Sequence, residues 1–321
     1  SGKFAGLYVC NGDKTTATAT TEECSTSTGN TGVAFIEELL AEEETKHNGL
    51  VQTYATVNGE QVDAGIRYVG SAPNNKVYFN CKDTDSNNVN YGETDYDYAS
   101  SCEVWRIIGV FNTKTSASDT VGAKRIKLVR DAFSINMSWD SSSRGDSGTE
   151  NNGGYGINEW SQADLKNMLN GYYIGVEGAT CTYCSGSNQG TCTNDCSSSV
   201  TPLSSTSIDM IDSVLWNTGA PTYLDPLPLS TMYAGERGTQ NGKICTSGDY
   251  CNDSVERTTT WEGLVGLIYP SDYAYASTDA GCANDIFGSN STCNTNNWLH
   301  PSSGYYWTIT PRADSSHATL V

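Results

Sequence analysis

Apolar residues recur at helical spacing near the start of the chain. Between residues 31 and 48 they form one face of a predicted helix, namely Val33, Ile36, Leu39 and Leu40. Thr31 is a candidate N-cap, and Asn48 followed by Gly49 is a candidate end. The acidic residues between positions 37 and 44 then form the solvated face of this helix.

Strand-like patterns begin at residue 65. Residues 65–69 and 76–80 are short, β-rich segments that flank a turn-forming stretch at 71–75, so we predict a β-hairpin. Residues 104–111 are apolar enough to form a central strand. In residues 124–130 charged and apolar positions alternate, and we expect one face of that strand to be exposed to solvent.

The second half of the chain predicts further short elements. Residues 161–170 read as a helix with Ser161 as N-cap, and residues 206–216 as another helix with an apolar side. Residues 260–268 fit a helix or a strand, and we expect Pro270 to mark the end of that element. Residues 306–310 are a late strand.

Charge and composition restrict the classes of partner. The 321 residues carry a net charge of −19, which disfavours binding to nucleic acids and to anionic membrane surfaces. No stretch is long and apolar enough for membrane insertion. The 19 tyrosines and seven tryptophans supply much of the apolar area of a folded core.

Twelve cysteines indicate a disulfide framework and therefore an extracellular protein. They fall into local groups, so that each bridge closes a loop: Cys10 with Cys24, Cys81 with Cys102, Cys245 with Cys251, Cys282 with Cys293, and the cluster Cys181, Cys184, Cys192 and Cys196. The cluster permits three pairings. Its spacing also resembles a zinc knuckle, but the other eight cysteines favour two disulfides.

The pattern divides the chain into an N-terminal helical and loop segment, residues 1–60, and an α+β domain, residues 61–321. Within that domain, residues 178–205 are rich in Cys, Ser, Thr and Gly and are interpreted as an inserted, disulfide-closed loop.

Candidate chemistry is sparse. The stretch that starts at Asp83 and Asp85 resembles the beginning of a calcium loop, but Asn88 stands where the turn glycine belongs, so calcium is a weak expectation. Only three histidines are present, at positions 47, 300 and 317. Asp140, Glu159 and Glu236 are the first candidates for catalytic acids, although a structural role fits each of them better.

Tyrosines that alternate with Asp and Ser are the stronger functional signal. Residues 91–98 and 269–275 have this composition, which suits sugar or protein recognition when the rings are exposed and core packing when they are not. We take as candidate binding residues Tyr96, Tyr98, Tyr273 and Tyr275.

Several strings taken together resemble a known group of proteins. They are GIRYVG (65–70), NNKVYFN (74–80), CEVWRIIG (102–109), IKLVR (126–130), SWD (138–140), WS (160–161), LNGYY (169–173), YPSDY (269–273) and WTITPR (307–312). Their order is similar to that in uncharacterised secreted surface proteins of Firmicutes-type bacteria with a C-type-lectin-like, or formylglycine-generating-enzyme-like, domain. The resemblance implies a mixed α+β fold with a small twisted sheet, two flanking helices and long disulfide-stapled loops.

In that group the pattern runs on past the last tryptophan strand, whereas this sequence stops at Val321. The resemblance therefore implies an open strand edge near Val321, which a second copy can fill in self-assembly. Taken together, we expect a non-catalytic extracellular recognition or adhesion module at the cell surface that binds a glycan or a surface protein. The alternatives are a structural subunit of a pilus-like filament or layer, and a secreted hydrolase.

Overall fold

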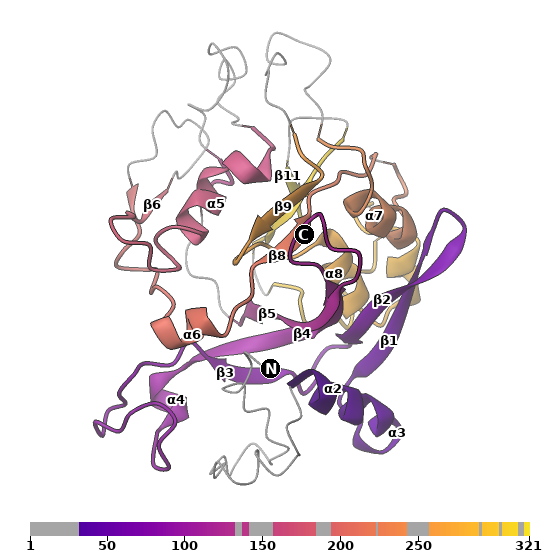
Figure 1. Ribbon diagram of the computed structural model, residues 1–321. Coiled ribbons are helices and arrows are strands. Elements are labelled where there is room, and N and C mark those ends of the chain that lie inside the picture. Colours follow the sequence, from indigo (N-terminus) through magenta and orange to yellow (C-terminus); the bar gives the residue numbers. More distant parts are fainter. Residues whose placement is uncertain are drawn as a thin grey trace, which may run out of the picture.

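The computed structural model describes residues 32–131, 137–140, 157–183, 194–222, 224–242, 257–288, 291–301, 304–313 and 318–321. The fold is mixed α+β, and its strands pair antiparallel within each sheet. In Figure 1 the largest sheet occupies the lower half, and β8, β9 and β11 lie above it. The five strands of this sheet are β1 (Leu50–Val57), β2 (Glu60–Tyr68), β3 (Lys76–Phe79), β4 (Glu103–Thr113) and β5 (Ala123–Arg130).

Strand β4 is the centre of the sheet, as its apolar sequence predicted. Strands β2 and β3 both pair with one side of β4, at opposite ends, while β5 pairs along the other side. Four isoleucine and valine side chains fill the interior here with at most 8% of their surface exposed: Ile107, Ile108, Val110 and Ile126. Each contributes about 1.5–3 kcal/mol through the apolar area it buries.

The predicted hairpin of residues 65–69 and 76–80 is wrong, because β2 and β3 do not pair with each other. The chain leaves β2 at Gly70, whose amide donates to the carbonyl of Ala276 and whose carbonyl accepts from the amide of Trp298. Asn75 then returns the chain to β4, since its side-chain amide donates to the carbonyl of Ile107 at 2.9 Å. The true partner of β2 is β1, and the expected domain boundary at residue 60 falls at the start of β2, beside the turn between these strands.

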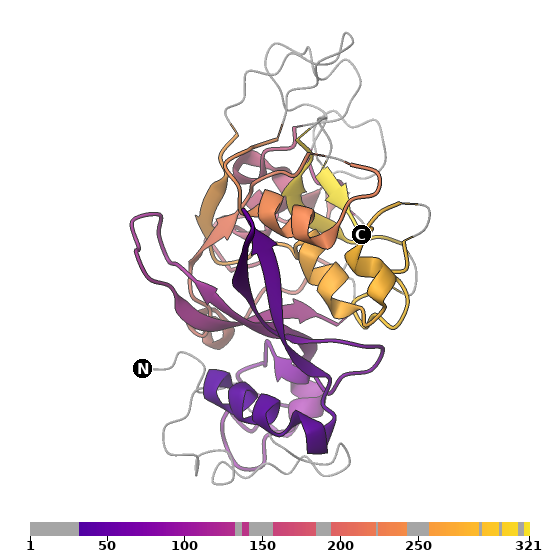
Figure 2. The same cartoon turned by 90° about the vertical axis from the view of Figure 1, so that its right-hand side faces the viewer.

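Helices cover both faces of the sheet. Figure 2 shows α2 (Gly32–Ala41) on one side and α7 (Leu229–Glu236) with α8 (Pro270–Ala276) on the other. The expected helix is confirmed: Ile36 and Leu39 of α2 are buried, and a short α3 (Glu43–Lys46) follows. Thr31, the expected N-cap, lies outside the described residues.

Two other predicted helices are corrected. The helix expected at 161–170 begins as the 3-10 turn η2 (Trp160–Gln162), which Glu159 caps, and continues as α5 (Asp164–Leu169), so Ser161 is not its N-cap. The helix expected at 206–216 is the short α6 (Ser205–Asp209) followed by the strand β8 (Val214–Asn217). Val214 and Trp216 favour a strand, which pairs with β9 (Thr260–Gly263).

Pro270 begins a helix and does not end one. It is the first residue of α8, a position where proline is favoured because the missing N–H has no partner inside a helix. The late strand is confirmed as β10 (Trp307–Pro311), which pairs with β11 (Ala318–Leu320). The remaining short elements are α4 (Tyr98–Ser101), β6 (Thr182–Tyr183), β7 (Asn194–Asp195) and η3 (Ala280–Ala283).

Three disulfides close local loops. Cys81 pairs with Cys102 and Cys282 with Cys293, as predicted, and in the four-cysteine cluster Cys181 pairs with Cys196. This last bridge overturns the zinc alternative, because two of the four thiolates are not free to bind a metal ion. The cysteines outside the described residues are Cys10, Cys24, Cys184, Cys192, Cys245 and Cys251.

A second apolar cluster lies above the sheet. Trp160 is 1% exposed, and its ring centroid is 5.6 Å from that of Trp139 and 5.8 Å from that of Trp261. The Cys181–Cys196 bridge and Ile309 of β10 belong to the same cluster. Among the described helices, none combines the length and the apolar character needed to cross a bilayer.

Candidate functional site

A cavity of about 810 Å³ lies beside the central sheet, between β5, β8 and the segment 264–269. Residues 125–130 of β5 form one wall, and Val214–Asn217, all of β8, form part of another. Apolar and aromatic side chains make up most of the lining, among them Phe111, Leu128, Met168, Trp216, Leu264 and Leu267. Cavities of this size and character are typical of ligand sites.

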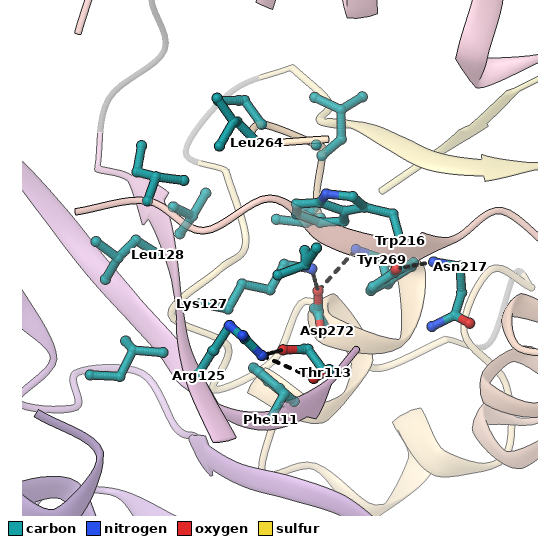
Figure 3. Close-up of a pocket in the computed structure, with 18 of the residues that line it drawn as sticks. Phe111, Thr113, Arg125, Lys127, Leu128, Trp216, Asn217, Leu264, Tyr269 and Asp272 are labelled. Atoms are coloured by element: carbon teal, nitrogen blue, oxygen red, sulfur yellow. Dashed lines mark hydrogen bonds and ion pairs between the residues drawn. The ribbon is translucent and has the colours of Figure 1, made fainter. Parts of the chain in front are cut away.

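Lys127 and Asp272, which line this cavity (Figure 3), belong to a buried ion network. Asp272 of α8 accepts hydrogen bonds from Nη1 of Arg67 at 2.7 Å and from Nζ of Lys127 at 2.6 Å. Its other contact is the main-chain N–H of Tyr269, which Oδ2 accepts at 3.0 Å and which anchors the first turn of α8. One carboxylate therefore joins β2, β5 and α8.

The protonation states of this network follow from burial and charge. Burial alone would raise the pKa of Asp272, but the charges of Lys127 and Arg67 hold that pKa well below its usual range. Burial lowers the pKa of Lys127, and Asp272 opposes that effect. Asp272 is thus an anion at neutral pH, shared by two cations.

Aromatic rings complete the surroundings of both cations. Nζ of Lys127 lies 4.1 Å from the ring centroid of Tyr269 and 5.1 Å from that of Trp216. The guanidinium of Arg67 lies 4.5 Å from the ring centroids of both Phe111 and Tyr275. These rings attract the cations while excluding water from them.

A second ion pair adjoins the first. Glu236 is fully buried and accepts from Nη1 of Arg237 at 2.7 Å and from the N–H of Ser271 at 2.8 Å. Burial raises the pKa of Glu236. Burial alone would lower the pKa of Arg237, but Glu236 holds that pKa above its ordinary value. Because Ser271 belongs to α8, its hydrogen bonds to Glu236 tie α7 to α8.

The residues that line the cavity carry a net positive charge, whereas the whole chain carries a net negative charge. The wall holds five of the chain's 18 lysines and arginines, which are Lys114, Arg125, Lys127, Arg130 and Arg237. It holds three of the 37 acidic residues, which are Asp63, Asp212 and Asp272. The net charge of these lining residues is therefore +2, and it is +1 when their ion-pair partners Arg67, Glu103 and Glu236 are included, in a chain whose net charge is −19. Four of these cations have ion-pair partners within the protein, but the wall is far less acidic than the chain as a whole, which favours an anionic group in the ligand over a cationic one.

The expected exposed face of residues 124–130 is wrong. Lys127 points into the fold, where its side chain is 15% exposed and bound to Asp272, and Arg125 bonds to Asp212 at 3.0 Å. In the sequence Lys127 lies between Ile126 and Leu128, in a segment where charged and apolar residues alternate, and this pattern is equally typical of a solvent-exposed face. The identity of its buried partner was not readable, since Asp272 lies 145 residues further on.

Two of the four candidate binding tyrosines are buried, so the exposure expected of them is wrong. Tyr96 is 5% exposed because its hydroxyl donates to the carbonyl of Lys82 inside the Cys81–Cys102 loop. Tyr273 is 6% exposed because it packs in the core, with its hydroxyl 2.9 Å from Nδ1 of His300. Tyr98 and Tyr275 are half-buried, and the hydroxyl of Tyr275 donates to the carbonyl of Tyr54.

Of these four tyrosines, the structure packs together the rings of Tyr96 and Tyr98. Tyr96 and Tyr98 have ring centroids 4.9 Å apart on the disulfide-closed loop, while Tyr273 and Tyr275 belong to α8. Asp85, of the calcium-like stretch, accepts main-chain N–H groups from Asn87, Val89 and Asp97, and so it holds that loop in shape. Within the described residues no cluster of His, Cys, Asp and Glu is arranged to hold a metal ion.

The three candidate catalytic acids have structural partners. Oδ1 and Oδ2 of Asp140 accept the N–H groups of Asp164 and Ile157, each at 3.0 Å. Oε1 and Oε2 of Glu159 accept the N–H groups of Ser161 and Thr258. Of the histidines, His47 caps α3 in a left-handed conformation, His300 contacts Tyr273, and His317 lies outside the described residues.

Comparison with known proteins finds no family model, curated protein or solved structure that matches this chain.

Proposed function

We propose that this chain is a non-catalytic recognition module that works outside the cytoplasm and binds its partner in the cavity beside β5. The observation that carries the proposal is the cavity itself, which is large, mostly apolar and lined by a net excess of cations in a strongly acidic protein. A partner with an apolar body and negative groups fits this site better than a neutral glycan does.

The hydrogen bonds made by the three candidate acidic residues support a binding function rather than a hydrolytic one. Glycoside hydrolysis needs two carboxyl groups directed at the substrate. Asp140 and Glu159 instead direct both oxygens at main-chain N–H groups of the fold, and Glu236 is fully buried against Arg237 and Ser271. A secreted hydrolase therefore has little support from these three residues.

The disulfides support an extracellular location. Three bridges close loops of the described chain, and such local bridges form and persist in oxidising compartments. A lectin-like arrangement, in which a compact α+β core displays long stapled loops at a cell surface, accommodates the Cys81–Cys102 and Cys181–Cys196 loops. The adhesion role and the lectin-like fold belong to this proposal.

A filament or layer subunit is the second candidate. Strand β11 pairs only with β10 within the part of the chain that the structure describes, and Leu320 on β11 is 39% exposed. Edge strands of this kind can pair with a second copy. Light scattering at rising protein concentration tests this candidate, and a particle that stays monomeric removes it.

The proposed function is tested with an apolar anionic dye, anilinonaphthalene sulfonate, and an apolar cationic dye of similar size. Calorimetry on the folded protein is expected to show saturable binding of the anion that is at least about tenfold tighter than that of the cation. Leu128→Trp, which fills the cavity, should weaken binding of the anion. Val104→Trp is the matched control, because Val104 is 39% exposed on β4 and does not line the cavity.

Near-UV circular dichroism establishes that both variants retain native packing. Equal binding of the two dyes, or equal effects of Leu128→Trp and Val104→Trp, would overturn the proposed function.

A further inference from the structure

The cavity is long and narrow. Its lining includes both Trp105 and Thr113 of β4, and eight residues of an extended strand span roughly 25 Å. The volume of about 810 Å³, spread over that length, gives a mean cross-section of roughly 30 Å². An α-helix with its side chains is about 10–12 Å across, and an extended peptide occupies roughly 4.8 by 10 Å, so both are wider than this cavity.

One end of the cavity opens to solvent. Strands β2 and β4 run antiparallel with Ile66 opposite Val110, which brings Asp63 to the end of β4. Among the described residues of the lining, those exposed to solvent all lie at this end, and they are Asp63, Asn112 and Lys114. We refer to the opening beside these three polar residues as the mouth.

The other end is buried and apolar. It lies beside Trp105, whose ring centroid is 5.2 Å from that of Phe79. The lining side chains of this end are at most 9% exposed, and they are Phe79, Leu165, Met168, Tyr173, Val200 and Leu203. Three of the chain's four methionines line the cavity, which are Met137, Met168 and Met210. Methionine is flexible and adapts its shape to an apolar ligand.

The middle of the cavity does not call for a charged group in the ligand. Lys127 and Asp272 neutralise each other there, and the rings of Tyr269 and Trp216 lie beside Nζ of Lys127. The other three cations of β5 are also ion-paired, which are Lys124 with Glu37, Arg125 with Asp212 and Arg130 with Glu103. A charged group of the ligand is therefore best placed at the mouth, beside the exposed Lys114 and in contact with water.

We propose that the occupant of the cavity is a single unbranched hydrocarbon chain with an anionic head, such as the anion of a fatty acid. The chain lies along β5 with its tail against Met168 and Leu203, and the head lies at the mouth beside Lys114. This inference rests on the proposed function and names the class of its ligand. It adds a linear shape and a direction, which binding of an apolar anion alone does not require.

The first test compares two carboxylates with the same number of carbon atoms, undecanoate, which is a straight chain, and adamantane-1-carboxylate, which is a compact cage. Calorimetry on the unmodified protein is expected to show at least about tenfold tighter binding of undecanoate, because only the straight chain extends from the mouth to the apolar end. Equal or tighter binding of the cage would overturn the inference.

The second test locates the tail. On the unmodified protein, affinity should rise from octanoate to tetradecanoate by about threefold to fourfold for each added CH₂ group. Leu169→Trp, which shortens the cavity at its apolar end, should weaken tetradecanoate at least about tenfold and leave octanoate within about twofold. Val176→Trp is the matched control, because Val176 is 50% exposed and does not line the cavity.

Met210→Trp serves as a second filling variant if near-UV circular dichroism shows that Leu169→Trp has lost native packing. An affinity that does not depend on chain length would overturn the inference, as would equal losses for both chain lengths in the filling variant.

The third test locates the head. Lys114→Glu should weaken octanoate and tetradecanoate by the same factor, because it acts on the head and not on the tail. Lys82→Glu is the control, since Lys82 is also exposed and does not line the cavity. Equal effects of the two substitutions would overturn the direction assigned to the chain.

The outcomes separate the two proposals. If the anionic dye binds in the cavity and the straight chain binds no better than the cage, the linear ligand is wrong and the proposed function stands. If neither the dye nor any of the carboxylates binds, both fail.

Discussion

Lys127 and Asp272 are 145 residues apart in the chain, yet Nζ of Lys127 lies 2.6 Å from Oδ2 of Asp272. Arg67, on another strand, shares the same carboxylate at 2.7 Å. The three side chains fasten the central sheet to α8, and two of them, Lys127 and Asp272, also line the cavity. Stability and binding therefore depend on the same group of charges, and each can be tested separately.

Asp272→Asn should destabilise the fold strongly. The substitution leaves Arg67 and Lys127 without a counter-charge inside the protein, and breaking a buried pair in this way costs about 3–5 kcal/mol. The free energy of unfolding in urea measures the effect. Asp131→Asn is the control, because Asp131 pairs with Lys76 and Arg106 near the surface and should change stability by less than about 1 kcal/mol. Similar losses in both variants would contradict the role given to Asp272.

Lys127→Met should cost less than Asp272→Asn, at about 1–3 kcal/mol, because Asp272 keeps its bond to Arg67 and methionine fills much of the lysine volume. The comparison is Lys124→Met on the same strand, where the side chain is 55% exposed and the expected change is within about 0.5 kcal/mol. Urea midpoints of the two variants should differ clearly, and coinciding midpoints would show that Lys127 is not part of a buried network.

The depressed pKa of Asp272 predicts a dependence of stability on pH. A carboxyl group whose pKa is lower in the folded than in the unfolded protein stabilises the fold above its unfolded value, about 3.9, and this stabilisation is lost as the pH falls. The stability difference between the native protein and Asp272→Asn should therefore be largest near neutrality and shrink below about pH 4. Burial raises the pKa of Glu236, so this group changes the free energy of unfolding in the opposite sense as the pH falls. Both proteins contain Glu236.

Urea unfolding of both proteins from about pH 7 to about pH 3 measures this difference. A gap that stays constant down to the lowest pH would mean that Asp272 is not the group whose ionisation stabilises the fold.

Removal of the Cys81–Cys102 bridge by a double substitution to serine should lower the free energy of unfolding by about 3 kcal/mol, because the bridge spans 21 residues. The rings of Tyr91, Tyr96 and Tyr98 pack together within this loop, so hydrogen exchange should speed up there first. An unchanged urea midpoint together with unchanged exchange would show that the ring cluster holds the loop without the bridge.

The sequence predicted elements better than it predicted their partners. The helix that contains Ile36 and Leu39 and the strand around Ile107 follow from local periodicity, and the structure has both. The hairpin was wrong because the turn-forming residues 71–75 are compatible with two arrangements. A local turn does not reveal that β4, further along the chain, is long enough to pair with β2 and β3 on the same side.

The site was missed for a related reason. Pro270 was read as the end of an element, although proline is equally suited to the first turn of a helix, and the helix it begins carries Asp272. The tyrosines drew attention as exposed rings, but Tyr273 is in the core and its neighbour Asp272 holds the cations. Asp272 lies 145 residues from Lys127 and 205 residues from Arg67 in the sequence, and the spacing of neighbouring residues does not predict contacts between such distant positions.

The position of Asp272 late in the chain also bears on the order in which the fold can assemble. Until residues near 272 have been made, the nascent sheet has Arg67 and Lys127 among its strands and lacks the carboxylate that both require. An unfinished chain consequently gains little by closing the sheet early. The arrival of α8 then supplies the missing anion, and the sheet can close around it.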